Sequence, residues 1–319
     1  MTDWKIPLYK IYTDDEDINL ITKIVKRGTF WALGPEILEF EKALKNYVDA
    51  DYCVTLNSGT SALHATLLSY NLGKEDEILI PSFSFVSTAN SVLFVNSIPK
   101  FVDIEEETFG IDPDKISENV SSKSKAIIPM DYGGISCKIM DIQEQAKDNN
   151  LILIEDAAES LGSSINNKKL GGISDSTIFS FCGNKVLTTG EGGAVVTNSK
   201  EVYEKIKLIR SHGRIDTKDY FSNPSESSYV GLGYNWRMSS ITATLGISQL
   251  QKLDKIIRMR KENAKYLIDN LQKIPEISVP LPPKDHEHIY QMFTIRLPNQ
   301  EIRDNLHSHL TKKQIFSKV

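Results

Sequence analysis

LILIEDAAES, residues 151–160, is the most informative segment of this chain for its architecture. Its first four residues are all apolar, without the alternation of a strand that has one solvated face, so we predict a strand buried on both faces. STIFSF (176–181) and GGAVVTN (192–198) have the same character, and helical patterns occupy 138–150 and 199–213. Apolar strands separated by helices predict an α/β fold, with helices covering both faces of a mostly parallel sheet.

The same alternation continues toward the N-terminus. Further strands are predicted at EILIPSFSF (77–85), PKFVDI (99–104) and KAIIPM (125–130), and a helix at TANSVLFV (88–95). Asp112-Pro113 has the cap and first-turn pattern that begins a short helix. Sheets of this kind bind ligands at the carboxyl ends of their strands, so the residues that follow each strand are the first candidates for function.

Toward the C-terminus, one apolar stripe predicts a single long helix from 239 to 274, and YQMFTIRL (290–297) is predicted to be a strand. We interpret 1–250 as a large cofactor-binding domain, with an N-terminal arm at 1–30. Residues 251–319 are interpreted as a linking helix and part of a small α/β domain. Because so little follows the helix, we expect a C-terminal truncation.

The overall composition narrows the class of protein. The 319 residues include 42 acidic and 37 basic side chains, a net charge of -5 that weighs against a nucleic-acid binder. The three cysteines are widely spaced and form no C-x-x-C pair, and the paired histidines have too few neighbouring ligands, so no metal site is assigned. The chain has no signal-peptide pattern and no apolar run near ~20 residues, which indicates a cytoplasmic protein without membrane contact.

A candidate phosphate site lies at NSGTS (57–61), between the strand-like CVTL and a helical pattern. Glycine and hydroxyl residues at a helix N-terminus present free N–H groups and the positive end of the helix dipole, which together suit a phosphate. The alternative is an ordinary N-cap with a glycine turn.

Asp156 ends the strand 151–156, and Glu159 follows one helical turn later. A carboxylate at the end of a buried strand needs a partner, and a protonated pyridine nitrogen is a suitable one. A structural acid that caps the next turn is the alternative for Asp156. For Glu159 the alternative is a solvated helix residue.

Lys185 lies in SFCGNKVLTTGEGG (180–193), between two apolar strands. Burial there favours the neutral, nucleophilic amine that forms a Schiff base, whereas the alternative is a solvated surface charge. Gly190, Gly192 and Gly193 allow close approach of the backbone. A phosphate turn, a strand-end aspartate and a loop lysine are together the three elements of a pyridoxal-phosphate (PLP) site.

Ordered motifs from about residue 7 to residue 270 resemble the DegT/DnrJ/EryC1/StrS family of PLP-dependent sugar aminotransferases, which have PLP-dependent transferase fold type I. The resemblance is carried by NSGTSALHATLLSYNLGKEDEILIPSFSFVSTANSV, PKFVDIEEETFGIDPDKI, KAIIPM, IEDAAESLGS, FSFCGNKVLTTGEGGAVVTN and GLGYNWRMSSITATLGISQLQKLD. The lysine segment and EDAAE resemble the perosamine-synthase branch in particular. The resemblance implies a seven-stranded-type sheet and a smaller C-terminal α/β domain.

The resemblance also implies residue roles. Lys185 corresponds to the Schiff-base lysine, Asp156 to the partner of the pyridine nitrogen, and Glu159 to the residue beside the phenolic oxygen. The remaining cofactor positions are the stacking aromatic and the phosphate-binding groups, namely Phe85, Gly59, Thr60 and Ser180. Asn235 corresponds to an asparagine that reaches the phosphate of a neighbouring subunit, which implies a homodimer with shared active sites.

Three further residues are candidates for substrate contact. Asp131 stands in MDYGG (130–134) where many members of the family have histidine near the substrate, which leaves the sugar preference open. Arg237 is either a ligand contact or a structural salt bridge. Trp31 either lines the site or belongs to the core or an interface.

The implied reaction transfers an amino group from L-glutamate, through PLP, to a nucleotide-linked keto-sugar, at C4 of a 4-keto-6-deoxy sugar. Lys185 argues against the dehydratases of the family, which carry histidine at this position. Two alternatives stay open. One is a non-catalytic or regulatory homologue, and the other is a PLP enzyme of a different reaction type, such as a lyase or desulfurase.

Overall fold

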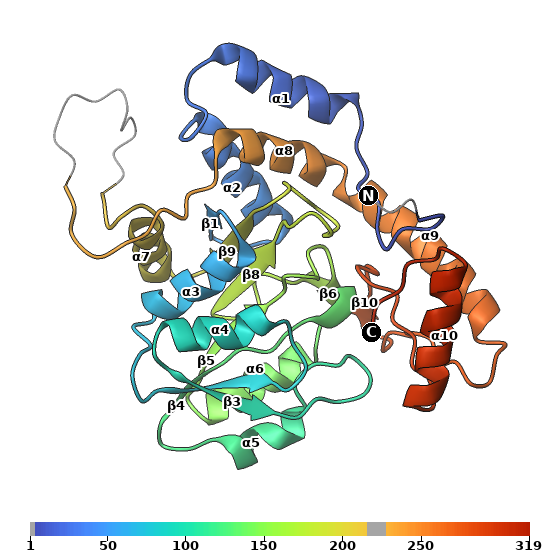
Figure 1. The fold of residues 1–319 in the computed structure, drawn as a ribbon. Helices are drawn as coiled ribbons and strands as arrows, with labels where there is room; N and C mark the ends of the chain where they lie inside the picture. The colour runs from blue at the N-terminus through green and yellow to red at the C-terminus, as the bar shows by residue number, and fades with distance from the viewer. Residues whose placement is uncertain (1–3, 216–227) are drawn as a thin grey trace.

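The computed structural model describes residues 4–215 and 228–319 and builds most of them around one large sheet (Figure 1). Its strands are β1 (Tyr52–Leu56), β2 (Glu77–Pro81), β3 (Ile98–Val102), β4 (Ser124–Ile127), β5 (Ile152–Asp156), β8 (Ser176–Ser180) and β9 (Gly193–Thr197). They lie in the order β1-β9-β8-β5-β4-β2-β3. The neighbours from β3 to β8 pair in parallel, and only β9 runs antiparallel to its neighbours. The predicted α/β fold with a mostly parallel sheet is therefore confirmed.

Helices cover both faces of the sheet, as the apolar strands required. The α-helices are α1 (Asp15–Arg27), α2 (Pro35–Tyr47), α3 (Gly59–Ser69), α4 (Val86–Phe94), α5 (Ile116–Asn119), α6 (Ile139–Asp148), α7 (Lys200–Arg210), α8 (Ser240–Gln251), α9 (Leu253–Leu271) and α10 (Gln300–Lys312). Short 3-10 helices span Pro113–Lys115 and Tyr132–Gly134. None of the helices in the described ranges is both long and apolar enough to cross a membrane.

Adjacent residues in each central strand point into two separate cores. In β5, Leu153 packs into a core with α2, α5 and α6, whereas Ile154 packs into a second core with α3, α4 and α7. Phe179 and Ile178 of β8 divide in the same way. Because both faces of these strands are buried, their sequences are continuously apolar instead of alternating.

The predicted long helix at 239–274 is wrong, because the chain forms two helices, α8 and α9, that meet at Lys252. Lys252 has φ -106° and ψ 5°, outside helical geometry, and its ammonium is buried against Asp17 of α1 at 3.0 Å. This contact holds the N-terminal arm on α8, and α9 turns away from the axis of α8 (Figure 1). The apolar stripe runs through the junction, so periodicity alone could not reveal the break.

The predicted strand at 290–297 is also wrong. Tyr290 has a left-handed φ of 53°, which interrupts extension, and the neighbouring N–H groups of Ile289 and Met292 donate to Gly134 and Gly133 of the large sheet's loops. Within the segment, Arg296 forms an isolated antiparallel bridge with Ser278. A small sheet of β10 (His286–Glu287), β6 (Ser164–Ile165) and β7 (Lys168–Lys169) lies just before it.

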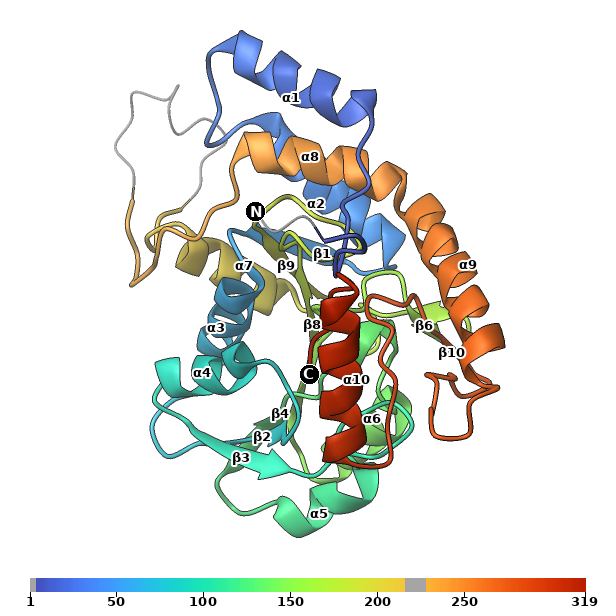
Figure 2. The same cartoon turned by 45° about the vertical axis from the view of Figure 1, so that its right-hand side comes forward.

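Residues 253–319, which we call the C-terminal segment, gather on one side of the molecule. Figure 1 shows α9 and α10 side by side, away from α3, α4 and α7, and in Figure 2 α10 lies at the centre of the view with α9 to its right. The helix α10, in which none of residues 300–312 is buried, was not predicted. The segment therefore attaches mainly through α9 and through the loop at 288–292.

Candidate active site

Three chain segments meet at the carboxyl ends of the central strands, and we call this region the carboxyl edge. It comprises residues 130–134 after β4, residues 156–159 after β5, and residues 180–185 after β8. Loops that follow neighbouring parallel strands emerge at the same edge of a sheet, which explains why residues more than fifty positions apart come together there.

Lys185 and Glu159 form an ion pair at the centre of the carboxyl edge. The Lys185 Nζ lies 3.1 Å from Glu159 Oε1, and their side chains are only 13% and 12% exposed. The other carboxylate oxygen of Glu159 accepts a hydrogen bond of 2.9 Å from the backbone N–H of Gly133. Glu159 is therefore oriented from two sides, and it links the loops that follow β4 and β8.

Asp156 lies beside this pair and is almost completely buried. Its Oδ2 accepts a hydrogen bond of 2.9 Å from the Thr88 hydroxyl, and its Oδ1 accepts one of 3.2 Å from the backbone N–H of Ala158. Burial raises the pKa of Asp156, although these two hydrogen bonds and the positive charge of Lys185 act in the opposite direction. A buried carboxyl group of this kind is stabilised in its charged form by a cationic partner, such as a protonated pyridine nitrogen.

The predicted phosphate turn lies at the same edge. Ser58 caps α3, with its Oγ accepting a hydrogen bond of 3.0 Å from the N–H of Ser61, so α3 begins at Gly59. A Cβ on Gly59 would lie 3.0 Å from Ser180 Cβ and 3.3 Å from its Oγ. Gly59 and Ser180 thus form a narrow cradle at a helix N-terminus, where the backbone N–H groups and the Ser180 hydroxyl suit a phosphate. The donors and acceptors of the carboxyl edge consequently fit PLP.

Three predicted residues have exposed side chains. Phe85 is the N-cap residue of α4 and is 67% exposed, so its ring is free to stack on a ligand. Asn235 is exposed, and its backbone pairs with Ser211. Trp31 is 46% exposed, but its Nε1 donates to the Ile24 carbonyl of α1 at 3.1 Å, which supports a role in the N-terminal arm rather than in the site.

The two other predicted substrate residues have structural surroundings. Arg237 pairs through its backbone with Leu56 of β1, and its Nη1 lies 3.4 Å from the Ser211 hydroxyl. Asp131 is 0% exposed, and its Oδ1 accepts a hydrogen bond of 2.8 Å from the backbone N–H of Cys137. Asp131 therefore has no exposed surface through which its side chain could contact a substrate directly.

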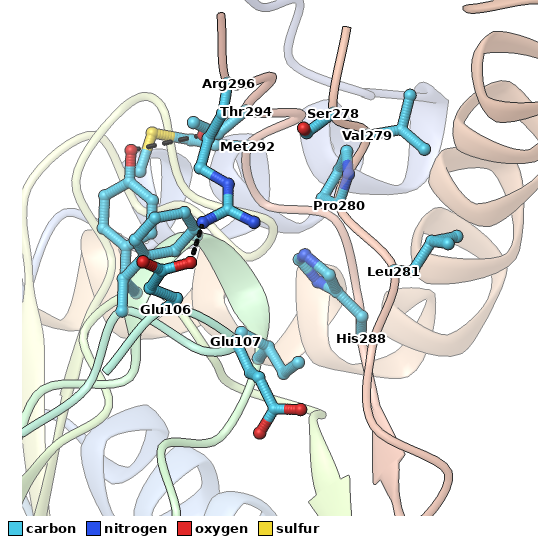
Figure 3. Close-up of a pocket in the computed structure, with 14 residues that line it drawn as sticks. Glu106, Glu107, Ser278, Val279, Pro280, Leu281, His288, Met292, Thr294 and Arg296 are labelled. Atoms are coloured by element: carbon cyan, nitrogen blue, oxygen red, sulfur yellow. Dashed lines mark hydrogen bonds and ion pairs between the residues drawn. The ribbon is translucent and has the colours of Figure 1, made fainter. Parts of the chain in front are cut away.

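A cavity of about 320 Å³ separates the carboxyl edge from the C-terminal segment (Figure 3). Tyr132 and Gly133 form part of its wall, and Gly133 is the residue that donates to Glu159. The C-terminal segment also contributes to the wall, and its Arg296 binds Glu106 of the large sheet's loops at 3.1 Å (Figure 3). Acidic, aromatic and hydrogen-bonding groups thus surround a space that adjoins the Lys185 site.

Sequence reasoning missed Gln291, which supports the lysine loop from the C-terminal segment. Its Nε2 donates a hydrogen bond of 2.8 Å to the carbonyl oxygen of Asn184, the residue before Lys185. Arg260 of α9 holds this part of the segment by donating to the carbonyl oxygens of Tyr290 and Gln291 at 3.1 and 3.2 Å. More than one hundred residues separate Gln291 from Asn184, and no motif marks the contact.

Comparison with known proteins gives a consistent result. The model of the DegT/DnrJ/EryC1/StrS aminotransferase family matches residues 12–319. The GDP-perosamine synthase of Caulobacter vibrioides is 34% identical over 272 residues, which cover 84% of this chain and 71% of the relative. The UDP-4-amino-4,6-dideoxy-N-acetyl-beta-L-altrosamine transaminase of Campylobacter jejuni is 38% identical over 263 residues, covering 82% of this chain and 68% of the relative.

A solved structure extends this similarity to the fold. The putative sugar aminotransferase Spr1654 of Streptococcus pneumoniae, in its PLP form, superposes with a TM-score of 0.89 and 25% identity, covering 98% of this chain and 84% of that one. The motifs, the geometry of the carboxyl edge and these similarities agree on a PLP-dependent aminotransferase. The chain belongs to the DegT/DnrJ/EryC1/StrS aminotransferase family.

Proposed function

We propose that this aminotransferase moves an amino group from L-glutamate to a nucleotide-linked keto-sugar, at C4 of a 4-keto-6-deoxy sugar. The observation that carries the proposal is the Lys185–Glu159 ion pair beside the buried Asp156. The sugar class is supported by the family and by the two relatives, whose names specify a GDP-linked and a UDP-linked sugar. The acidic and aromatic cavity beside Gly133 is suited to sugar hydroxyl groups.

Each side chain at the carboxyl edge has a distinct role in this proposal. PLP, when bound, supplies the electron sink and carries the amino group between the two substrates. Asp156 keeps the ring nitrogen protonated, and the Gly59–Ser180 cradle binds the phosphate with Thr60. Lys185 holds the cofactor and moves a proton at its Nζ, and Glu159 orients that amine from 3.1 Å.

We further propose that the enzyme acts in the cytoplasm as a homodimer with shared active sites. The support is a set of large apolar side chains that are more than half exposed. They belong to α1, α2, α4 and the loop before Asn235, namely Ile18, Leu38, Val86, Leu93, Phe94 and Leu232. A second subunit that covers such side chains would remove apolar area from water.

The experiment is a pair of half-reactions with purified, PLP-loaded protein. L-Glutamate alone should yield 2-oxoglutarate, close to one per subunit, together with a shift of the cofactor absorbance from the visible to the near-ultraviolet. The converted protein is then offered GDP-linked and UDP-linked 4-keto-6-deoxy sugars, and mass spectrometry detects the amino sugar. Light scattering measures the mass of the particle in parallel.

The outcomes separate the alternatives. A protein that binds PLP but ignores glutamate is a non-catalytic homologue, and one that releases an elimination product or sulfide is a PLP enzyme of another type. If the converted protein aminates a 2-keto acid but neither sugar, only the sugar assignment is contradicted.

A further inference from the structure

Two acidic side chains near Asp156 are completely buried. Asp131 follows β4 and Glu155 lies in β5, and both are 0% exposed. The ionisable groups that face them are Asp156 and the Cys137 thiol, and Glu105 acts on that thiol from the neighbouring loop. Among the described residues, none of the groups that act on these two carboxyls is a cation. Two negative charges buried here would therefore lack a compensating charge, and their stability requires an explanation.

Only one of the two carboxyl oxygens of each side chain accepts a hydrogen bond. Asp131 Oδ1 accepts from the N–H of Cys137 at 2.8 Å, and Glu155 Oε2 accepts from the hydroxyls of Thr177 at 2.7 Å and Ser174 at 3.4 Å. Among the described residues, no donor reaches Asp131 Oδ2 or Glu155 Oε1, and each of the two carboxyl groups affects the pKa of the other. Two carboxylates have no hydrogen to donate, so these two buried oxygens can form a hydrogen bond only if one of them carries a proton.

We propose that Asp131 and Glu155 share one proton at neutral pH, and that this pair is a positioning element for Glu159 and Lys185. The proton turns two repelling carboxylates into a hydrogen-bonded acid and carboxylate. It also supplies the one donor that the two unpartnered oxygens lack.

The backbone connects the pair directly to the carboxyl edge. Asp131 N–H donates to the Asp156 carbonyl at 3.0 Å, and Ser160 Oγ donates to the Asp131 carbonyl at 2.9 Å. The contact between Asp131 and Cys137 closes the turn that contains Gly133. Because Gly133 orients Glu159, which in turn binds Lys185, a displaced Asp131 would disturb the amine at which the proposed chemistry occurs.

The direction of the pKa shifts is consistent with a shared proton. Burial, and then the charge of Glu155, raises the pKa of Asp131, and burial also raises the pKa of Glu155. The folded protein thus keeps a proton that the unfolded chain loses near pH 4. This contribution to stability is fully present below the unfolded pKa and is lost as the pH rises through the raised folded value.

The first test is infrared spectroscopy of wild-type protein against D131N and E155Q at neutral pH. Either amide places an N–H group where the shared O–H lies, so both variants keep the hydrogen bond and one negative charge. The wild-type minus variant difference should contain the band of a protonated carboxyl group, and the exposed Asp114→Asn serves as the matched control without it. Absence of this band from both differences would overturn the shared proton.

The second test separates positioning from simple structure. The urea midpoint of wild-type protein should fall more steeply with rising pH than that of D131N or E155Q, and equal slopes contradict the proposal. Asp131→Ala removes the carboxyl group that shares the proton with Glu155 and should lower kcat more than tenfold with little change in KM for glutamate, while D131N retains more of kcat. Equal loss of kcat in both variants would mean that Asp131 has no positioning role.

The kinetic test rests on the proposed function, whereas the infrared and urea measurements do not require turnover. If the wild-type protein ignores glutamate, the proposed function fails and the proton-sharing pair is still tested. If turnover is normal and the infrared band is missing, only the pair fails.

Discussion

The carboxyl edge and the C-terminal segment both contribute to the Lys185 site, but through different groups. At the carboxyl edge, side chains carry the chemistry, and Asp156, Glu159 and Lys185 all follow strands whose two faces are buried. The C-terminal segment contributes mainly hydrogen bonds to backbone atoms of Gly133, Gly134 and Asn184. A rigid sheet thus places the reactive groups, and a less buried segment fixes the loops between them.

The largest effect is expected when the amine of the carboxyl edge is removed. Lys185→Ala should lower kcat about 1,000- to 10,000-fold, because the variant loses the group that holds the cofactor and moves the proton. The rate of 2-oxoglutarate formation measures the effect. The exposed Lys168→Ala is the control, and a similar loss in that variant would show that the effect is not specific to the site.

Removing the charge of Asp156 is expected to have the next largest effect. Asp156→Asn still accepts from the N–H of Ala158 but no longer pairs with a protonated ring nitrogen, which should weaken PLP binding by about 3–4 kcal/mol. Fluorescence titration with PLP gives the affinity. Unchanged affinity would contradict the role of Asp156, and thermal unfolding of the apoprotein controls for damage to the fold.

A pH experiment tests the C-terminal segment alone. Burial lowers the pKa of His288 to about 4, although the contact of its Nδ1 with the Gly134 carbonyl at 3.0 Å acts in the opposite direction, and the neutral ring is therefore the stable form in the fold. Because the folded pKa lies below the unfolded value, this stability is present above about pH 6.5 and is lost as the pH falls toward 4. The free energy of unfolding should therefore fall by up to about 3 kcal/mol more in wild type than in His288→Gln.

Urea unfolding from pH 7.5 to pH 4.5 measures this difference. Identical pH dependence in wild type and His288→Gln would show that the histidine is not held neutral. The proposed Asp131–Glu155 pair has the opposite sign, since its contribution falls as the pH rises, so the two regions are distinguished by the direction of their pH dependence.

The smallest expected effect comes from the contact that joins the two regions. Gln291→Ala removes the donor to the Asn184 carbonyl and should cost about 1–2 kcal/mol, which corresponds to roughly a tenfold loss of kcat/KM. The exposed Gln272→Ala is the matched control. Normal kcat/KM in Gln291→Ala would show that the C-terminal segment does not position the lysine loop.

The sequence was sufficient to predict the sheet and most of the carboxyl edge, because buried strands and helix caps have recognisable local sequence patterns. LILIED predicted both a strand and an acid at its end, and Ser58-Gly59 predicted the start of α3. Tertiary contacts explain the failures. The break at Lys252 depends on Asp17 of another helix, and the left-handed Tyr290 depends on the loops it contacts.

Two further failures also have physical causes. The helix α10 has an N-cap, since Asn299 accepts from the N–H of Ile302, and Ile302, Leu306 and Leu310 recur at helical spacing, so its local signals were present although the helix buries no residue. The sequence places Asp131 directly after a predicted strand, and the structure places it at the carboxyl edge. The direction of its side chain, toward Glu155 and Cys137, is set by packing that no local pattern encodes.

The role of Lys185 is tested most directly by locating the cofactor on the chain. Wild-type protein is incubated with PLP, reduced with borohydride and digested, and mass spectrometry identifies the modified lysine. We expect one pyridoxyl group per subunit on Lys185, and none in Lys185→Ala. Stoichiometric modification of another lysine, or of none, would contradict it.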